Sequence, residues 1–177
     1  MDTQCRPGAD LIARARAGDM ACFERLVEPL YDGAYRLAAA MLDDRSAAED
    51  AVQDALLLAW RKLRRFREGD DLRPWLMTLV ANRCRDLRRR RWWSVLRLAT
   101  VPERATADEM AHVVVDTDLR RALASLPFAE RLVLVLRYYL DLPFDDVARI
   151  AHVSGPAARK RAQRGLTRLR SMLGEEE

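Results

Sequence analysis

The stretch FDDVARIAHVSGPAARKRAQRGLTRLR, Phe144–Arg170, decides the fold. It predicts two short helices separated by a tight break at His152-Val153, and the first of them is amphipathic. Ser154 can cap the second helix, because its hydroxyl accepts an otherwise unpaired backbone N–H, and Pro156 is tolerated in the first turn. Two short helices joined by a tight turn indicate a helix-turn-helix.

The second predicted helix carries different chemistry on its two sides. Its apolar stripe recurs at helical spacing and consists of Ala158, Ala162, Leu166, Leu169 and Leu173. The exposed stripe beside it holds Arg159, Lys160, Gln163 and Arg164. No acidic residue interrupts 159–170. A helix of this kind can place its hydrogen-bond donors in the major groove of DNA.

Two other interpretations of this basic helix stay open at this point. It can be an ordinary solvated helix face, or a helix that lies on an anionic membrane surface. A membrane-surface helix usually has Trp or Phe on its apolar side, whereas this side is alanine and leucine. The break, the cap and the acidic preceding helix therefore favour the helix-turn-helix.

Composition indicates a helical protein with a polyanionic partner. Half of the 177 residues are hydrophobic, so the chain can form one sizeable domain or two small ones. Seven glycines and seven prolines are few, and the bias toward Ala, Leu, Arg and Glu favours helices. The net charge is +4, and basic residues cluster along the chain. Such clusters are typical of proteins that bind nucleic acid.

Several functional classes are disfavoured. Cys5, Cys22 and Cys84 lack metal-site spacing, and two histidines are too few to complete a metal site. No grouping of carboxylate, histidine and nucleophile indicates catalysis, so we expect neither an enzyme nor a cofactor. No signal peptide is evident, and no apolar run approaches the roughly 18 residues of a membrane span. We expect a cytoplasmic protein without membrane insertion.

The first half predicts a group of helices. Asp10–Ala17 can form a short helix, and apolar residues recur on one face across Phe23–Met41. Asp43-Asp44-Arg45 breaks this second helix. A capping box, with Ser46 at the N-cap and Glu49 at N3, predicts the start of a third helix.

Two faces in this half are candidate binding surfaces. On the third helix, the side chains off the apolar stripe are Asp50, Gln53, Asp54 and Leu57. This face is either ordinary solvated helix or a docking face. The fourth helix, with Pro74 in its first turn, has a polar stripe of Thr78, Asn82, Arg85 and Arg89. It ends in RRRRWW, Arg88–Trp93, which can bind phosphates and stack on unpaired bases, or pack its indoles on the domain.

The remaining chain completes an all-α organisation in two domains. Residues 94–115 lose periodicity and mix proline, threonine and acids, which predicts a flexible linker. Helices resume at Asp116, and a strongly apolar helix follows Pro127. We therefore predict a first helical domain over 10–93 and a second, with the helix-turn-helix, over 116–173.

With these elements placed, the chain resembles the extracytoplasmic-function (ECF) sigma factors of bacterial RNA polymerase over roughly Leu11–Leu173. The motifs that carry the resemblance are, in chain order, DAVQD (Asp50–Asp54), RPWL (Arg73–Leu76), ANR (Ala81–Arg83), LP (Leu126-Pro127) with Arg131, LRY (Leu136–Tyr138) and LTRLR (Leu166–Arg170). Each motif alone has low specificity. Their shared order across one linker makes the resemblance strong.

The resemblance implies an alternative sigma factor, which binds core RNA polymerase and directs promoter-specific transcription initiation. The first domain would correspond to sigma region 2 and the second to region 4. The clamp of the polymerase would be bound through Asp50, Gln53, Asp54 and Leu57, and its flap would be a further contact. The linker would run through the active-site cleft and the RNA exit path. An anti-sigma factor is expected as a second protein partner.

The resemblance also assigns DNA contacts. The opened non-template strand of the minus-ten element, with one flipped base, would contact Phe66, Arg73, Asn82, Arg85, Arg88 and Arg89. Duplex DNA at the minus-thirty-five element would be read by Arg159, Lys160, Gln163 and Arg164. Two departures predict an unusual base preference: Pro156-Ala157-Ala158 stands where the family commonly has Gly-Thr-Val, and Lys160 replaces a small residue.

Two alternative functions remain to be separated from this one. The first is a dimeric helix-turn-helix regulator that is not incorporated into polymerase. It would give no function to Arg88–Trp93 or to the candidate docking face of the first domain. An enzyme acting on nucleic acid would need clustered carboxylates or a metal-ligand set, which the sequence lacks. Co-sedimentation with core polymerase would distinguish the sigma factor from both.

Overall fold

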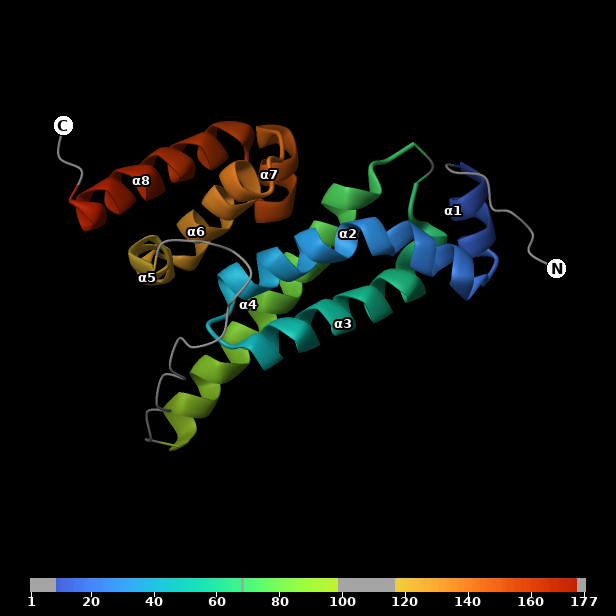
Figure 1. Ribbon diagram of the computed structural model, residues 1–177, viewed down its shortest axis with the longest axis horizontal. Coiled ribbons are helices and arrows are strands. Elements are labelled where there is room, and N and C mark those ends of the chain that lie inside the picture. Colours follow the sequence, from blue (N-terminus) through green and yellow to red (C-terminus); the bar gives the residue numbers. More distant parts are fainter. Residues whose placement is uncertain (1–8, 68, 99–116, 175–177) are drawn as a thin grey trace.

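The computed structural model describes residues 9–67, 69–98 and 117–174, and these ranges are helical throughout apart from turns and short loops (Figure 1). The α-helices in these ranges are α1 Ala9–Arg16, α2 Met20–Met41, α3 Arg45–Lys62, α4 Leu72–Leu98, α5 Thr117–Ser125, α6 Phe128–Leu134, α7 Phe144–Ala151 and α8 Gly155–Leu173. A 3-10 turn, Leu63–Arg65, follows α3, and a π-helical segment, Val135–Tyr139, continues α6. The predicted all-α class is confirmed.

Helices α1 to α4 form the first bundle. Helix α3 packs against α2 and α4, α2 also packs against α4, and α1 closes one end beside α2 (Figure 1). The largest fully buried side chains in this bundle are Leu37, Met41, Leu63, Leu76, Met77, Val52 and Val80. The Trp60 ring meets Phe23 edge-on, with 5.1 Å between the ring centroids. Apolar periodicity therefore places the core of this domain correctly.

The start of α3 differs from the predicted capping box. Asp44, not Ser46, is the N-cap residue, because its carboxylate accepts a hydrogen bond from the Ala47 N–H at 3.0 Å. Glu49 pairs instead with the Arg45 Nε at 3.1 Å. The capping-box prediction is wrong. An aspartate two residues earlier is an equally good cap, and its negative charge is further stabilised at the positive end of the helix.

Helices α5 to α8 form the second bundle, and the helix-turn-helix lies within it. His152 closes α7 in the left-handed conformation, with φ 54°, and the Ser154 hydroxyl accepts the Ala157 N–H at 3.3 Å. The predicted break and cap are both confirmed. The close approach of α6 and α8 depends on Gly165, since a Cβ there would lie 2.9 Å from Leu134 Cδ1.

Helix α4 is longer than expected. It runs to Leu98, whereas the first domain was predicted to end at Trp93, so the predicted linker begins as helix. Arginine and leucine, which dominate this segment, are good helix formers. The rest of the predicted linker, 99–115, lies outside the described residues, as do the side chains of Trp92 and Trp93.

The two bundles lie against each other. Helix α7 packs on α4, and α6 with its π-helical continuation packs on α2 (Figure 1). Leu140 is 5 % exposed, and its Cδ2 lies 4.0 Å from the position a Cβ on Gly33 would take. Arg131 Nη1 pairs with Asp43 Oδ1 at 3.4 Å across the same boundary. The second domain therefore covers one side of α4.

Candidate nucleic-acid and partner interfaces

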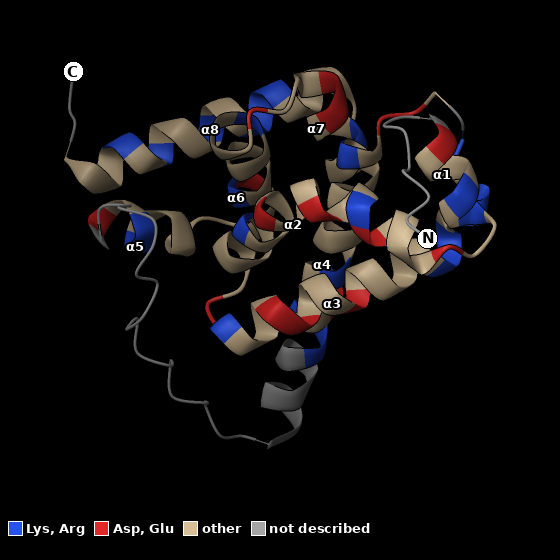
Figure 2. Cartoon of the chain, turned by 45° about the vertical axis from the view of Figure 1, so that its right-hand side comes forward, with Lys and Arg blue, Asp and Glu red and all other residues tan. Residues whose placement is uncertain are grey.

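The outer face of α8 presents the four side chains predicted to read duplex DNA. Arg159, Lys160, Gln163 and Arg164 are all exposed, while Ala158, Ala162 and Leu169 are buried on the opposite side. Positions three and four residues apart lie on one helix face, so the structure brings these four side chains together. Blue segments mark the basic residues along α8 in Figure 2.

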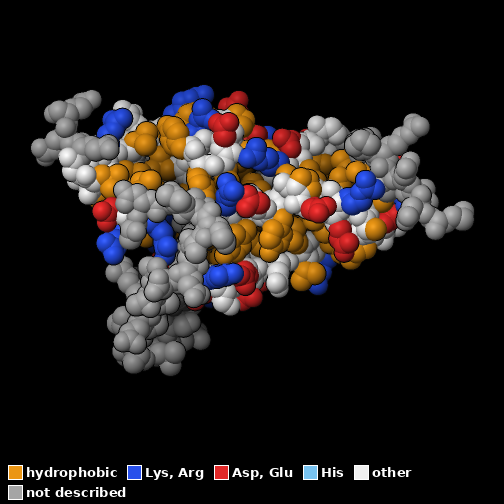
Figure 3. Space-filling model, in the orientation of Figure 1, with side chains coloured by type: hydrophobic (Ala, Val, Ile, Leu, Met, Phe, Trp, Pro, Cys, Tyr) orange, Lys and Arg blue, Asp and Glu red, His pale blue; other side chains and the backbone are white. Residues whose placement is uncertain are grey.

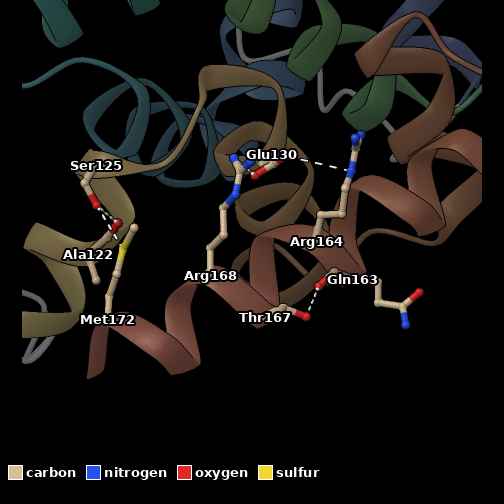
Figure 4. A network of polar contacts seen from close by, with 8 residues as sticks. All are labelled: Ala122, Ser125, Glu130, Gln163, Arg164, Thr167, Arg168 and Met172. Atoms are coloured by element: carbon tan, nitrogen blue, oxygen red, sulfur yellow. Dashed lines mark hydrogen bonds and ion pairs between the residues drawn. The ribbon is translucent and has the colours of Figure 1, made fainter. Parts of the chain in front are cut away.

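One buried carboxylate lies behind this face. Glu130, on α6, has a side chain that is 7 % exposed. Arg168 Nη1 donates to its Oε2 at 2.8 Å, and Arg164 Nε lies 3.8 Å from its Oε1 (Figure 4). The Gln163 side chain extends away from this cluster in the same view. A buried carboxylate needs cationic partners, so Glu130 restrains Arg164 on one side of the face.

Glu130 was not among the residues predicted for this interface. Its signal was a single acid beside Arg131 at the start of a mostly apolar helix, and such an acid has no assignable partner until α6 and α8 are brought together. Arg159 is restrained as well, because its guanidinium lies 5.4 Å from the centroid of the Phe144 ring. The face is therefore a set of exposed donors held from behind by its own domain.

The polar face of α4 has a different environment, because the second domain lies on it. Arg85 Nη2 donates to the Ile150 carbonyl oxygen at 2.9 Å, and Arg85 Nη1 donates to Asn82 Oδ1. His152 Nε2 lies 3.1 Å from the same Oδ1, which accepts from it. Burial lowers the pKa of the Arg85 guanidinium below its ordinary value, and the nearby positive charge of Arg161 lowers it further. Arginine nevertheless stays charged at neutral pH.

Two further predicted strand contacts are engaged by the same domain. Arg73 Nη2 donates to the Leu140 carbonyl oxygen at 2.5 Å. The guanidinium of Arg88 lies 5.1 Å from the centroid of the Phe128 ring at the start of α6. Arg89 instead points to solvent, with its side chain 72 % exposed. Four of the six predicted minus-ten side chains therefore contact the second domain.

Phe66 occupies a position unlike the other predicted contacts. It is 3 % exposed, and its ring centroid lies 5.1 Å from that of Trp75. It follows the 3-10 turn and fixes the start of the loop to the core of the first domain. In this conformation Phe66 is an anchor of the loop rather than a surface side chain.

The predicted docking face on α3 is open over most of its length. Asp50, Gln53 and Leu57 are exposed, and Leu57 keeps 56 % of its surface in solvent. Asp54 is half-buried because it pairs with Arg83 on α4. Figure 3 shows hydrophobic side chains at the surface over α2 and α3, with acidic and basic side chains among them. A bare leucine among carboxylates is a suitable contact for a protein partner.

The described residues offer no metal-binding group of three or more His, Cys, Asp or Glu side chains. Cys22 and Cys84 are buried, and burial raises the pKa of the Cys84 thiol to about 12. A thiol of this kind packs as a small hydrophobic side chain. Within the same ranges, every helix is too short or too polar to cross a membrane.

Comparisons with known proteins match both bundles. The family described as Sigma-70 region 2 matches residues 26–94, and Sigma-70, region 4 matches residues 116–169. The ECF RNA polymerase sigma factor SigM of Mycobacterium tuberculosis is 32 % identical over 170 residues, which cover 96 % of this chain and 86 % of SigM. The RNA polymerase sigma factor CarQ of Myxococcus xanthus is 34 % identical over 167 residues, covering 92 % and 95 %.

A solved structure with a similar fold is the sigma factor RpoE in complex with the anti-sigma factor NepR from Bartonella quintana. It superimposes with a TM-score of 0.79 at 25 % identity, covering 88 % of this chain and 98 % of that one.

Proposed function

This chain belongs to the ECF sigma factors of bacterial RNA polymerase, and we propose that its two DNA faces divide promoter recognition between them. As an alternative sigma factor it binds core polymerase and promoter DNA and directs transcription initiation. A free-standing dimeric regulator is not favoured, because both sigma regions are present in one chain. Its place of action would be the cytoplasm, where the chromosome and the polymerase are.

The outer face of α8 would enter the major groove at the minus-thirty-five element. Arg159, Lys160, Gln163 and Arg164 supply donors on one exposed surface without an intervening acid. A guanidinium can hold the O6 and N7 of a guanine with two hydrogen bonds, which lysine cannot copy. Since Glu130 limits the positions that Arg164 can take, Arg164 is suited to a base contact.

The polar face of α4 would hold the opened strand of the minus-ten element. Asn82 offers hydrogen-bonding groups for a base edge, while Arg73, Arg85 and Arg88 offer charged donors for phosphates. Arg73 and Arg85 already bind backbone oxygens in this structure, and these contacts support their use as oxygen-binding groups. Phe66 would support the adjoining loop from within the core.

Partner proteins would use other surfaces. The α3 face of Asp50, Gln53 and Leu57 would bind the polymerase clamp, with Asp54 positioned by Arg83, and the second domain would bind the flap. A sigma factor of similar fold is bound by an anti-sigma factor in its solved structure, so we expect a negative regulator of that class here.

The observation that carries the proposal is the pair of donor-rich helix faces, α4 and α8, on separate sigma regions. The test is transcription by purified core polymerase plus this chain on a library of randomised promoter sequences. We expect transcription that depends on the chain and selects two separated sequence elements. Binding of the chain to duplex DNA as a dimer, with no association with core polymerase, would contradict the proposal.

A further inference from the structure

One arginine of α4 lies in the apolar stripe that faces the first bundle. Leu76, Val80 and Leu87 pack in or against the core, and their spacing predicts a further core side chain at position 83. That position holds arginine, and the Arg83 side chain is only 26 % exposed. Its Nε is buried, and within the described ranges no group accepts a hydrogen bond from it.

The stability of the bundle does not explain Arg83. A buried N–H without an acceptor costs free energy, because it has lost its hydrogen bonds to water. Replacing a charged pair that has been taken out of water by apolar side chains is often neutral or stabilising. A methionine or leucine at this position would therefore suit the core at least as well, and the reason for an arginine lies in the group that it holds.

That group is Asp54 of the docking face on α3. The Arg83 Nη2 pairs with Asp54 Oδ2 where α3 packs on α4. Asp54 is still 43 % exposed, so its carboxylate is held from within the bundle and also reaches the surface. Asp50, one turn earlier on the same face, is exposed and has no ion pair in the described part of the chain. The two carboxylates of this face are therefore held differently.

We propose that Arg83 is a positioning residue for the polymerase contact, and that the first domain gives up stability to keep it. By pairing with Oδ2 of Asp54, the guanidinium fixes the direction in which Oδ1 accepts a hydrogen bond from the polymerase. A carboxylate that is already oriented loses less side-chain freedom on binding. This inference rests on the polymerase-binding role given to the α3 face under the proposed function.

The pairing also changes how the two carboxylates respond to salt. The cation beside Asp54 offsets much of its charge, so Asp54 contributes mainly through an oriented hydrogen bond. Asp50 acts through its charge, and salt screens the attraction between exposed charges. Without Arg83, Asp54 would act in the same way as Asp50, and its contribution to polymerase binding would weaken as the salt concentration rises.

Arg83→Met tests the inference, because methionine keeps the helix propensity of arginine and removes its charge and its donors. Arg83→Lys is the conservative variant, since it keeps the charge and lacks the planar fork of donors. Arg25→Met, at an exposed position of α2, is the control for the loss of one positive charge from the same bundle. Each variant is made in the full chain and titrated with core polymerase in the absence of DNA.

Two measured quantities distinguish positioning from support of the fold. The melting temperature of Arg83→Met should equal or exceed that of the wild type, because an apolar side chain suits the position. Its affinity for core polymerase, followed by fluorescence anisotropy of the labelled chain, should fall about tenfold, and the loss should grow as salt is raised. Arg83→Lys should recover part of the affinity, and Arg25→Met should keep both quantities near the wild-type values.

A double-mutant cycle identifies the group through which Arg83 acts. In an Asp54→Ala background, Arg83→Met should cause almost no further loss of polymerase affinity, because the carboxylate that it positions is absent. In an Asp50→Ala background, the same substitution should cause its full loss, because Asp50 is not held by Arg83.

The outcomes separate this inference from the proposed function. Wild-type affinity in Arg83→Met, or a melting temperature below that of Arg25→Met, would overturn the inference, while weak binding by Asp54→Ala would still support the α3 face. A full loss from Arg83→Met in the Asp54→Ala background would make Arg83 a direct polymerase contact and overturn the inference as well. Normal binding by both Asp50→Ala and Asp54→Ala would instead overturn the role proposed for the α3 face, and the inference with it.

Discussion

The two proposed DNA faces of this sigma factor differ in which domain holds their side chains in place. On α8, the exposed donors are restrained from behind by Glu130 and Phe144 of the same domain. On α4, Arg85 and Asn82 are restrained from the front by Ile150 and His152 of the other domain. The proposed duplex-reading face on α8 is therefore exposed and held within its own domain, whereas the proposed strand-binding face on α4 is covered by the other domain.

Mutations on the two faces should therefore have different energetic consequences. Damage to the support of the α8 face should impair base preference and the stability of the second domain together. Damage to the α4 contacts should have two opposing effects. It loosens the packing of the second domain on α4, which uncovers the face, and it removes groups that would bind the strand.

The α8 face should be damaged most by a side chain at Gly165, where α8 packs closely on α6. A Cβ at this position lies 2.9 Å from Leu134 Cδ1 and 3.2 Å from its Cγ, so Gly165→Val should force α6 and α8 apart. We expect a loss of about 3 kcal/mol in the free energy of unfolding, from overpacking. Urea denaturation followed by circular dichroism measures it.

Gly33 offers a control for that substitution. A Cβ there meets Met77 at 3.7 Å and Leu140 at 4.0 Å, which are ordinary contacts. Gly33→Ala should therefore keep or raise stability, by up to about 1 kcal/mol from helix propensity. If Gly165→Val and Gly33→Ala lowered the free energy of unfolding equally, close packing of α6 on α8 would not be the reason for the loss at Gly165.

The covered α4 face should respond to Arg85→Ala in two opposite ways. Loss of the bond to Ile150 should loosen the free chain, and loss of a charged donor should weaken strand binding in the holoenzyme by about 2 kcal/mol. Permanganate footprinting on a promoter selected by the library experiment measures opening through thymine reactivity. Binding of the closed duplex should change much less.

Asn82→Ala should reduce opening in the same direction, because the amide shares the face with Arg85. Arg61→Ala serves as the control, since Arg61 is an exposed arginine near the end of α3 and is not among the proposed strand contacts. We expect its effect on opening to be smaller. Unchanged thymine reactivity in both Asn82→Ala and Arg85→Ala would contradict the strand assignment.

Local chemistry explains which parts of this comparison the sequence could predict. The α8 face follows from periodicity and the absence of acids in 159–170, and the Ser154 cap depends on residues three apart. The α4 polar stripe was also predictable as a stripe. That the second domain covers this stripe could not be predicted, because polar residues of the same kind occur both on solvated faces and at interfaces between domains. The contacts that cover the stripe join residues 65 to 70 positions apart in the sequence.

Two further positions show where local sequence chemistry leaves a choice open. The start of α3 was misplaced because Asp44 and Ser46 are both good caps two residues apart, and only the backbone conformation decides between them. Phe66 is assigned to the minus-ten strand by family resemblance alone, and that role stays a prediction. Its burial against Trp75 is what hydrophobicity alone predicts for an aromatic ring in a polar loop.

A further prediction addresses the support behind the α8 face. Arg164→Ala should relax preference at one position of the minus-thirty-five element by about 1–3 kcal/mol, and Arg164→Lys should not rescue it. Glu130→Gln removes the charge beside Arg164 and should relax the same position by about 1 kcal/mol. Holoenzyme transcription from a library of minus-thirty-five sequences measures both.

The double variant decides whether Glu130 acts through Arg164. If it does, Glu130→Gln in an Arg164→Ala background should add almost nothing to the change in base preference, as coupled residues behave in a double-mutant cycle. Arg168→Ala controls for the other ion pair of Glu130, at 2.8 Å, and should affect stability more than base preference. A uniform loss across all sequences, largely rescued by Arg164→Lys, would make Arg164 a phosphate contact.

The α3 face differs from both proposed DNA faces, because it is open and its proposed partner is a protein. Asp50 is exposed, and no ion pair to it occurs within the described ranges, whereas Asp54 pairs with Arg83. Asp50→Lys should therefore leave the free energy of unfolding within about 0.5 kcal/mol of the wild type. Asp54→Lys should cost up to about 1 kcal/mol more, because it replaces a half-exposed ion pair with two like charges. Both substitutions should weaken binding to core polymerase, measured by co-sedimentation.

Asp54→Asn separates the two roles of Asp54, since it loses the ion pair with Arg83 without adding repulsion. Normal polymerase binding by Asp50→Lys in a folded protein would remove this face from the polymerase interface, and weakened binding by Asp54→Lys alone would then be explained by its effect on Arg83.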